Sequence, residues 1–547
     1  MSRTKSSTVN EVTDNYIASL DPNNLPPPAI MEAELIEQTC AVFEIENTQR
    51  PKGQKWSMPQ TLFNIQIARL LSHCSHVVRI AAAGLQQNPA YDLLGIYMDD
   101  GENKGIYVTS PTQLRGEISK YNSLVTQKDV DEIIRWLYVY AKRVERTSDA
   151  NLVAMNNGVF DFNAKQLLPF SPDYVFTVKS HVNYNPLATN VVIHNPDDGT
   201  DWNIEDWMND ISSDPEIVRL LWEVVGSVLR PNAHWDKSVW FYSEVGSNGK
   251  GTLCSLMRNL LGEHAYASIP LSDFSKDFML EPLVAANAII VDENDVGVFV
   301  DKCANLKAII TGDVIMINRK FKDPITYRFK GVMIQCLNEM PRFRDRSDSF
   351  YRRQLFIPFE KSFTGMERKY IKNDYLARQE VLEYVAYKVL NMDYNKFSEP
   401  DACVQALDSY KEFNDPVRQF LNQVLPECQW DLLPYSWLYA LFVAWMKVTN
   451  PSGIPQSRNT FIATIRSEYK NSDTWYAMEN DDTALRADRY MDKPELLTVE
   501  YKLRDWYNPL YSGNDNDKIA IPPQHSRYRG LLRKDRATRV ARNVEEE

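Results

Sequence analysis

Short apolar runs alternate with helical stretches over residues 238–360, and this alternation is typical of an α/β fold. Apolar runs stand at 238–241, 288–291, 332–337 and 355–359. Each is short enough to be one buried strand, and helical periodicity fills much of the sequence between them. The pattern therefore predicts an α/β core over residues 236–375.

Outside the core the pattern is mainly helical. Residues 1–30 are polar and end in a proline run, so we expect a flexible lead-in. We predict an N-terminal α+β domain at 31–200, in which Asn156-Asn157-Gly158 turns between two strands. The remaining predicted parts are a helical block at 201–235, a helical domain at 376–480 with a helix-turn-helix at 438–469, and a C-terminal extension with a basic tail at 481–547.

A glycine-rich segment follows the first apolar run of the core and precedes a helical stretch. Backbone N–H groups of such a loop can surround phosphate oxygens, and the amino end of the next helix adds positive potential. A lysine at the end of the loop can reach the outer phosphates of a nucleotide. The loop predicts binding and hydrolysis of a nucleoside triphosphate by Gly246, Ser247, Asn248, Gly249, Lys250, Gly251 and Thr252.

Two positions depart from the usual phosphate-loop pattern. Glu244 stands where the first glycine is expected, so the turn has to be made with Gly246 alone or with a shifted loop. Gly251 follows Lys250 in place of Ser or Thr, and Thr252 comes one position late. Direct ligation of Mg²⁺ by Thr252 is therefore open. A glycine-rich turn with an incidental lysine is the alternative.

Polar residues end two later strands of the core. Asp292 and Glu293 follow the run at 288–291, and we predict that Asp292 holds the magnesium shell while Glu293 polarises the attacking water. Asn338 ends the run at 332–337 and is predicted to contact the γ-phosphate. Each residue has a simpler explanation, since strands often end in acids and an Asn suits a turn.

Cations occupy two further places. Arg352 and Arg353 precede the last core strand, where an arginine can stabilise transition-state charge, often in the site of a neighbouring subunit. Two strand-like arms flank a turn expected at 322–324. The basic residues near that turn are Arg319, Lys320 and Lys322. Such a hairpin can grip a phosphate backbone, although a solvated edge hairpin protected by lysine explains it equally well.

Composition narrows the function classes. A chain of 547 residues with 44% hydrophobic and 24% charged residues is typical of a soluble protein of about three domains. No apolar run is long enough to span a bilayer, so we expect a cytoplasmic protein without a membrane partner. The seven cysteines form no Cys-x-x-Cys pair, which favours neither a zinc ribbon nor a disulfide framework. The net charge of −12 leaves nucleic-acid contacts to local basic patches.

Five segments together resemble the superfamily 3 DNA helicases, in particular the phage and plasmid primase-helicase branch related to the poxvirus primase-helicase NTPase. The segments are Gly-Ser-Asn-Gly-Lys-Gly-Thr (246–252), Ile-Ile-Val-Asp-Glu-Asn (289–294), Leu-Lys-Ala-Ile-Ile-Thr-Gly-Asp (306–313), Cys-Leu-Asn-Glu-Met-Pro-Arg (336–342) and Phe-Tyr-Arg-Arg-Gln-Leu-Phe-Ile-Pro-Phe (350–359). The resemblance implies an AAA+-like P-loop NTPase core flanked by mainly helical N-terminal and winged-helix C-terminal domains.

The resemblance also implies a homo-hexameric ring that moves 3′ to 5′ on single-stranded or forked DNA in replication of a phage, plasmid or other mobile element. ATP and Mg²⁺ would bind at subunit interfaces, and residues 201–235 would belong to the collar of the ring. The implied roles of phosphate lysine, two acidic-motif residues, sensor and trans-acting arginine fall on Lys250, Asp292, Glu293, Asn338 and Arg353. Lys320 and Lys322 would grip DNA. A primase or DNA polymerase is an expected partner, and the bacterial host cytoplasm the expected location.

Two other function classes remain open at this point. A DNA-binding replication initiator with little unwinding activity would use the helix-turn-helix at 438–469 and the basic tail. A P-loop kinase for a small metabolite would explain the Gly-Lys-Gly-Thr sequence, but it would need neither the hairpin nor Arg353. DNA-stimulated ATP turnover separates the three classes.

Overall fold

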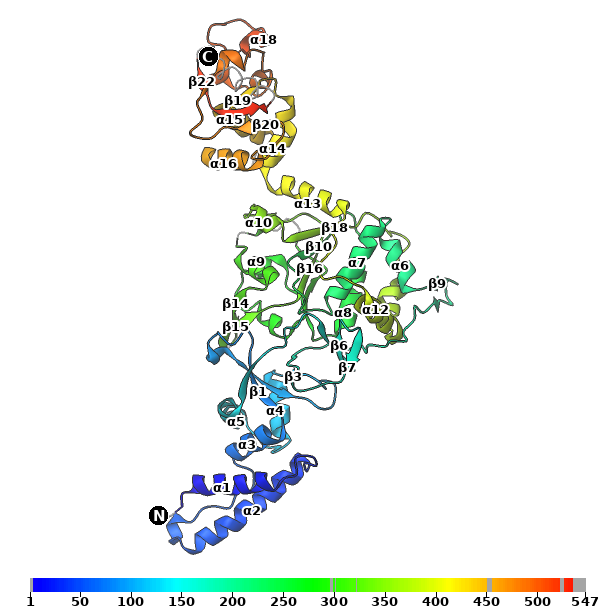
Figure 1. Ribbon diagram of the computed structural model, residues 1–547, viewed down its shortest axis with the longest axis vertical. Coiled ribbons are helices and arrows are strands. Elements are labelled where there is room, and N and C mark those ends of the chain that lie inside the picture. Colours follow the sequence, from blue (N-terminus) through cyan, green and yellow to red (C-terminus); the bar gives the residue numbers. More distant parts are fainter. Residues whose placement is uncertain are drawn as a thin grey trace. The chain divides into compact units, whose positions relative to one another are not determined.

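The computed structural model describes residues 3–295, 299–300, 302–320, 322–449, 455–521 and 526–534. The chain divides into two compact units, Met1–Leu407 and Asp408–Glu547, and the boundary falls within helix α13 (Asp401–Asn414) (Figure 1). Within the described residues, no helix is both long and apolar enough to cross a membrane.

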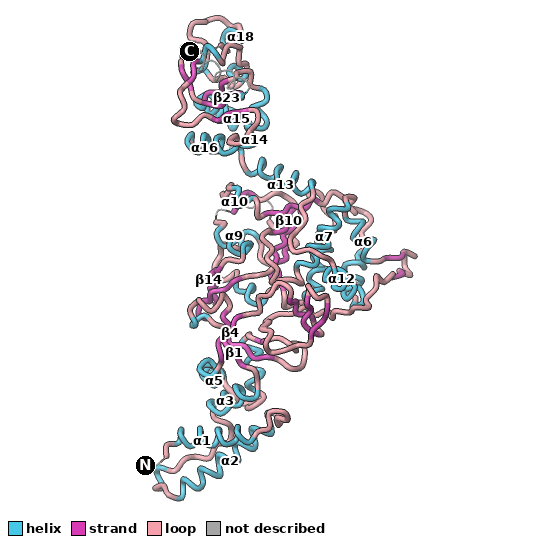
Figure 2. The backbone as a smooth tube through the Cα atoms, viewed as in Figure 1, coloured by secondary structure: helices cyan, strands magenta, loops and turns pink. Residues whose placement is uncertain are grey.

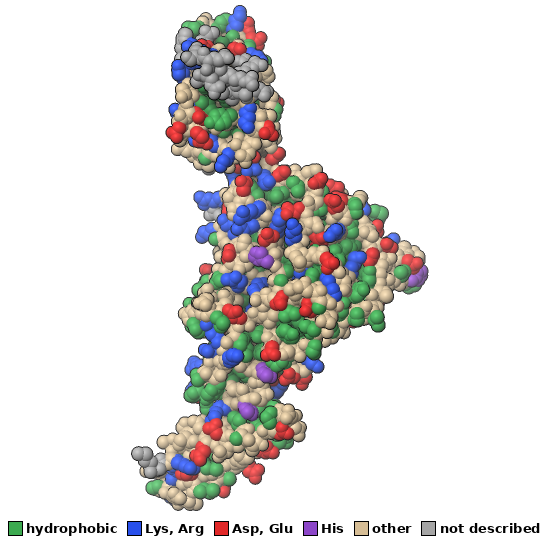
Figure 3. Space-filling view, viewed as in Figure 1, with side chains coloured by type: hydrophobic (Ala, Val, Ile, Leu, Met, Phe, Trp, Pro, Cys, Tyr) green, Lys and Arg blue, Asp and Glu red, His purple; other side chains and the backbone are tan. Residues whose placement is uncertain are grey.

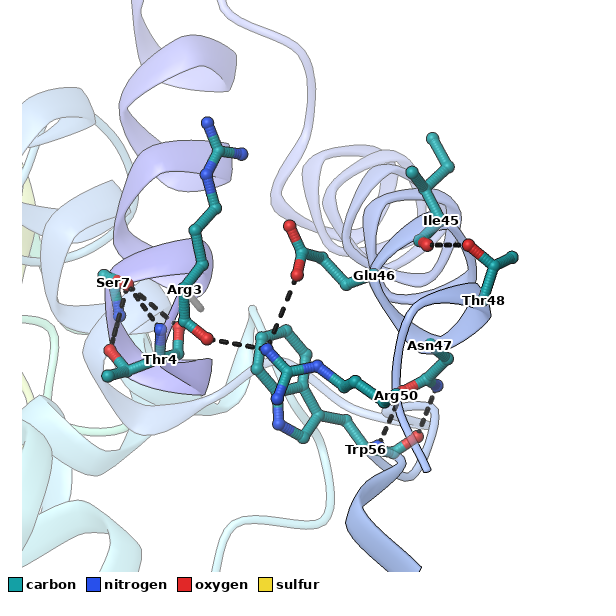
Figure 4. A network of polar contacts seen from close by, with 9 residues as sticks. All are labelled: Arg3, Thr4, Ser7, Ile45, Glu46, Asn47, Thr48, Arg50 and Trp56. Atoms are coloured by element: carbon teal, nitrogen blue, oxygen red, sulfur yellow. Dashed lines mark hydrogen bonds and ion pairs between the residues drawn. The ribbon is translucent and has the colours of Figure 1, made fainter. Parts of the chain in front are cut away.

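The first unit begins with helix α1 (Lys5–Ser19), where the sequence pattern predicts a flexible lead-in. Thr4 caps the helix through a reciprocal pair of hydrogen bonds with Ser7, and Val12 and Tyr16 are buried in a cluster with residues of the next helices. The guanidinium of Arg50, beyond the end of α2 (Pro28–Thr48), donates to the backbone carbonyl of Arg3 at 2.6 Å (Figure 4). An ordered helix therefore replaces most of the expected lead-in.

A four-stranded sheet with helices follows. Its order is β3-β2-β1-β4, built from β1 (Val77–Ala81), β2 (Leu93–Tyr97), β3 (Tyr107–Val108) and β4 (Lys142–Glu145). The helices of this region are α3 (Asn64–Cys74), α4 (Pro111–Ser119) and α5 (Gln127–Tyr140). The turn predicted at Asn156-Asn157-Gly158 joins antiparallel strands β5 (Leu152–Met155) and β6 (Gly158–Asp161), and β7 (Gln166–Leu168) extends them. A short hairpin of β8 (Ile193–His194) and β9 (Asp201–Trp202) precedes the core.

A parallel five-stranded sheet forms the centre of the unit and confirms the predicted α/β class. Its order is β11-β12-β16-β10-β18, from β10 (Ser238–Tyr242), β11 (Tyr266–Ala267), β12 (Ala288–Val291), β16 (Val332–Leu337) and β18 (Gln354–Pro358). The apolar runs are continuous because both faces of the sheet are covered. Helices α6 (Ile204–Ile211), α7 (Pro215–Ser227) and α12 (Gln379–Asn391) lie on one side of it, and α9 (Ala304–Thr311) on the other (Figure 2).

The core extends past the boundary predicted at residue 375. Side chains of α7, the sheet, α8 (Lys250–Leu261) and α12 share one hydrophobic cluster, in which Leu220, Leu256 and Val385 are fully buried. Helix α12 thus completes the first unit, because its apolar face covers α7 and α8. The second unit begins about thirty residues later than the pattern suggested.

The predicted basic hairpin is present, with a shifted turn. Strand β14 (Val314–Arg319) pairs antiparallel with β15 (Lys322–Arg328), and an irregular register follows Ile317. Residues 322–324, expected to form the turn, belong to β15. Lys320 lies in the connection, and position 321 is outside the described residues.

The second unit contains helices and a three-stranded antiparallel sheet in the order β19-β23-β20. Its main elements are α14 (Pro416–Val424), β19 (Leu432–Pro434), α15 (Tyr435–Thr449), α16 (Arg458–Glu468), β20 (Trp475–Ala477) and β23 (Gly530–Arg533). Helices α15 and α16 occupy the predicted helix-turn-helix, whereas their connection at 450–454 and the basic tail from 535 lie outside the described residues. The predicted extension is not separate, because β23 is the central strand and Leu531 is fully buried.

Candidate functional site

The phosphate loop joins the carboxyl end of β10 to the amino end of α8. Its left-handed residues are Ser247, with φ of 55°, and Gly249, with φ of 87°. The side-chain amide of Asn248 donates to the carbonyl of Val245 at 2.5 Å, which closes the loop from inside. Gly246, which was one of the two expected ways to make the turn, is not left-handed. The loop is therefore a shifted one, held open by its own hydrogen bonds before any ligand binds.

Lys250 is the buried cation of this loop, with 6% of its surface exposed. Its ammonium donates to the carbonyl of Ser243 at 3.3 Å and to Oδ1 of Asn338 at 3.0 Å. Burial lowers the pKa of Lys250, and within the described residues no carboxylate accepts a hydrogen bond from it. A desolvated ammonium with only neutral acceptors is well prepared to receive an anion.

Strand order brings the predicted polar residues to one edge of the sheet. Strand β16 lies between β10 and β12, so Asn338 at its end stands between the phosphate loop and the acidic pair. The amide of Asn294 donates to Gln335 Oε1 at 3.0 Å and to the Cys336 carbonyl at 3.1 Å. These two bonds fasten the segment after Asp292 to β16.

The two carboxylates have different surroundings. Asp292 accepts two hydrogen bonds from the guanidinium of Arg258, one of them at 2.9 Å, and this contact lowers the pKa of Asp292 although partial burial opposes it. Glu293 is exposed. No hydrogen bond links Asp292 to Thr252 within the described residues, so the structure does not join the two predicted magnesium ligands.

Arg258 was missed by the sequence reasoning. It lies on α8, and its guanidinium also donates to the backbone carbonyl of Ile290 on β12 at 3.2 Å. The available signal was a single charged residue within the mostly apolar stretch 253–261. Its partner is far away in the sequence, so the pairing with Asp292 could not be read from spacing.

Arg352 and Arg353 lie at the opposite edge of the sheet from the phosphate loop. The backbone carbonyl of Arg353 accepts from the N–H of Ser238 at 2.8 Å, which places it beside the first residue of β10. The guanidinium of Arg353 donates to Ser349 Oγ at 2.6 Å. Because a five-residue strand spans roughly 16 Å, Arg353 cannot reach the phosphate loop of its own chain.

A large cavity lies directly beside the phosphate loop, and no motif pointed to it. Its volume is 890 Å³, and its walls come from the loop, from α6 and from residues 361–372. Ser247 holds these parts together, since its Oγ donates to Glu367 at 2.8 Å and its carbonyl accepts from the N–H of Phe363 at 2.7 Å. The walls include Trp202, Trp207, Ile211, Phe363, Met366 and Lys372. Apolar and cationic side chains thus share one chamber, large enough for the base and sugar of a nucleotide.

The hairpin brings Arg319 and Lys322 opposite one another in register. The guanidinium of Arg319 donates to the carbonyl of Asp323 at 3.0 and 2.8 Å, and the ammonium of Lys322 lies 3.7 Å from a carboxylate oxygen of Glu281. On the face drawn in Figure 3, Lys and Arg side chains are interspersed with Asp and Glu. The basic residues of the hairpin are therefore not part of a larger, purely basic surface on this face.

Two family models match parts of the chain. Residues 116–213 match the family described as D5 N terminal like, and residues 241–353 match a family of unknown function, DUF5906. The second match contains every candidate residue from Gly246 to Arg353. It does not by itself name a reaction.

Similar proteins add a viral relative. The chain is 24% identical over 236 residues to a protein of Acanthamoeba polyphaga mimivirus named "Putative helicase L207/L206", an alignment that covers 40% of this chain and 23% of the relative. The chain thus corresponds to less than a quarter of that protein's length. Two solved structures of the C-terminal region of NrS-1 in the apo state are 12% and 11% identical, with TM-scores of 0.41 and 0.38. Each alignment covers 76% of this chain, and they cover 97% and 88% of the respective NrS-1 chains.

Proposed function

We propose that this protein is an ATP-dependent DNA helicase of the superfamily 3 kind, which acts in replication of a virus, phage or plasmid. The observation that carries the proposal is the edge of the parallel sheet where Lys250, Asn338 and the pair Asp292 and Glu293 follow three adjacent strands. The match to the family described as D5 N terminal like and the similarity to a viral protein named as a helicase support it.

The residues at this edge fit ATP with Mg²⁺. The loop brings backbone N–H groups to the amino end of α8, and Lys250 lacks an anionic partner among the described residues. Bound Mg²⁺ would neutralise phosphate charge during transfer. Thr252 and Asp292 would hold it, and Asp292 would have to share or leave Arg258 to do so. Glu293, which is exposed, is free to orient a water molecule.

The position of Arg353 favours action between chains. It lies at the edge opposite the loop, so its guanidinium can serve a phosphate only in the site of a neighbouring copy. A head-to-tail ring of copies would bring this edge of one chain to the loop of the next. A homo-hexamer that moves 3′ to 5′ on a single strand, with hairpin β14–β15 in contact with DNA, is the assembly we propose.

ATP turnover with and without DNA tests the proposal. The purified chain should hydrolyse ATP faster with single-stranded DNA and should separate a fork that has a 3′ single-stranded arm. Lys250→Ala should lose turnover, whereas Lys120→Ala, an exposed lysine paired with Glu117, should keep it. Turnover that ignores DNA would favour a small-molecule kinase, and an intact Lys250→Ala activity would remove the phosphate-loop assignment.

A second candidate function is a DNA-binding initiator with little unwinding activity. Helices α14, α15 and α16 and strands β19, β20 and β23 follow one another in the order expected of a winged helix, with further short elements inserted between β20 and β23, and this order supports the candidate. A cavity of 620 Å³ beside α16 is lined by four arginines, namely Arg458, Arg466, Arg527 and Arg529. Site-specific duplex binding by the isolated sequence of this unit, together with absent strand separation by the full chain, would favour this candidate.

A further inference from the structure

Three cationic side chains meet where hairpin β14–β15 adjoins the N-terminal sheet. Arg328 ends β15, Lys330 follows it by two residues, and Arg146 directly follows β4. All three line one cavity of 250 Å³, whose other walls include residues 81–84 and Glu145. None of them belongs to the phosphate loop or to the turn of the hairpin.

The cluster keeps a net positive charge, because one carboxylate shares the cavity with the three cations. Glu145 is the acid that lines the cavity, and its Oε1 accepts from the backbone N–H of Leu85 at 2.8 Å. The guanidinium of Arg146 donates to the phenol oxygen of Tyr327. In the part of the chain that the structure describes, no carboxylate lies within ion-pair distance of Arg146, Arg328 or Lys330.

Two other cations of the same unit have close carboxylate partners. The Lys307 ammonium lies 2.7 Å from Asp345, and Arg258 is bonded to Asp292. Burial and repulsion from Arg146 and Arg328 lower the pKa of Lys330 to about 8, although the carboxylate of Glu145 opposes this shift. Three cations and one carboxylate around one partly buried cavity leave an excess of positive charge, and an anion in the cavity would relieve the remaining repulsion.

The cavity lies at the end of the outward face of β15, because Arg328 ends this strand and also lines the cavity. Ile325 and Tyr327 are each 1% exposed, so Lys322, Thr326 and Arg328 alternate with them on the other face of β15. Lys322 and Arg328 stand roughly 20 Å apart at the rise of an extended strand. This distance accommodates several nucleotides of an extended single strand between the turn of the hairpin and the cavity.

We propose that Arg146, Arg328 and Lys330 bind a phosphate of a single nucleic-acid strand that runs along the outward face of β15. The inference rests on the proposed function for the strand itself and extends its path to the N-terminal sheet. Guanidinium and ammonium groups recognise phosphate without reading bases, so the contact is independent of sequence.

Equilibrium binding of a labelled oligothymidylate to the full chain, measured without ATP at several salt concentrations, tests the pocket. Arg328→Glu should weaken binding by about tenfold or more at low salt. Arg328→Gln with Lys330→Gln should flatten the log–log salt dependence by up to roughly 0.7, the value for the one phosphate that the cluster binds. Lys120→Gln, a paired surface lysine elsewhere in the unit, should leave affinity and slope unchanged. Arg328 is exposed and has no ion pair among the described residues, so its variants should fold, which thermal unfolding checks.

The outcomes separate this inference from the proposed function. If the variants bind the strand with the same affinity and the same salt dependence as the parental chain, the proposed phosphate contact is wrong and the proposed function stands. Parental chain that neither binds DNA nor hydrolyses ATP overturns both. Binding of inorganic tripolyphosphate that the variants lose, with DNA affinity intact, would assign the pocket to a free polyphosphate and overturn the strand contact.

Discussion

Asn338→Asp gives a sharp test of the candidate nucleotide site, because it changes one atom type beside the buried ammonium of Lys250. In the parent a neutral amide oxygen accepts from this ammonium at 3.0 Å. In the variant a carboxylate would pair with it and would repel the terminal phosphate of ATP. The empty protein should therefore become more stable, while ATP should bind more weakly.

The magnitude follows from the geometry. Opposite unit charges 3.0 Å apart attract by about 5.5 kcal/mol at an effective dielectric constant of 20 and by about 1.4 kcal/mol in bulk water. Position 338 is exposed while Lys250 is buried, so a value near 2 kcal/mol is reasonable. ATP has to break this pair, and 2 kcal/mol corresponds to about 30-fold weaker binding.

Calorimetric titration with a non-hydrolysable ATP analogue, and thermal unfolding without nucleotide, measure the two effects. Asn163→Asp, which makes the same charge change at an exposed position, is the control. It should change neither the affinity for the analogue nor the unfolding temperature. Unchanged analogue affinity in Asn338→Asp would refute the reasoning, because it would mean that Lys250 does not leave Asn338 to meet a phosphate.

Three further outcomes are expected. Glu293→Gln should bind nucleotide but hydrolyse it at least a hundredfold more slowly, since an exposed amide cannot take a proton from water; collapse of binding would mean that the acidic roles are exchanged. Arg353→Ala and Lys250→Ala should each lose ATP turnover, and their mixture should regain part of it; proven mixing without recovery would count against action between chains. The pKa of Lys330, lowered to about 8 by burial and two arginines, predicts weaker DNA binding as pH rises from about 7 to about 9. Lys330→Arg should remove this pH dependence, and a parental affinity that stays flat over the same range would contradict it.

The sequence predicts the sheet edge well because strand ends are local signals. Asp292 follows an uninterrupted apolar run and Asn338 follows a run that is apolar except for Gln335, and in a parallel sheet such ends meet at one edge. The site roles of these residues stay predictions. The turn of the hairpin was misplaced because Asp323-Pro324 favours a turn, whereas the irregular register after Ile317 moves the connection toward Lys320.

Other features were hidden for different physical reasons. Helix α1 has little polar contrast between its faces, although Val9, Val12 and Tyr16 recur at helical spacing and are buried. The walls at 361–372 are mostly irregular chain, which carries no periodic signal. The cation cluster at Arg146 joins residues far apart in the sequence, so only tertiary packing reveals it.

If Arg353 serves the site of a neighbouring chain, as we propose, the opposite positions of Lys250 and Arg353 make activity depend on assembly. A single chain then holds no complete site, and a head-to-tail pair of chains completes one site of two. An open head-to-tail row of chains leaves one loop at one end and one Arg353 at the other end without a partner, and closure of the row into a ring completes every site. Turnover per chain should therefore rise steeply with protein concentration and then level off. A chain diluted below the dissociation constant of the assembly should be nearly inactive however well it binds ATP.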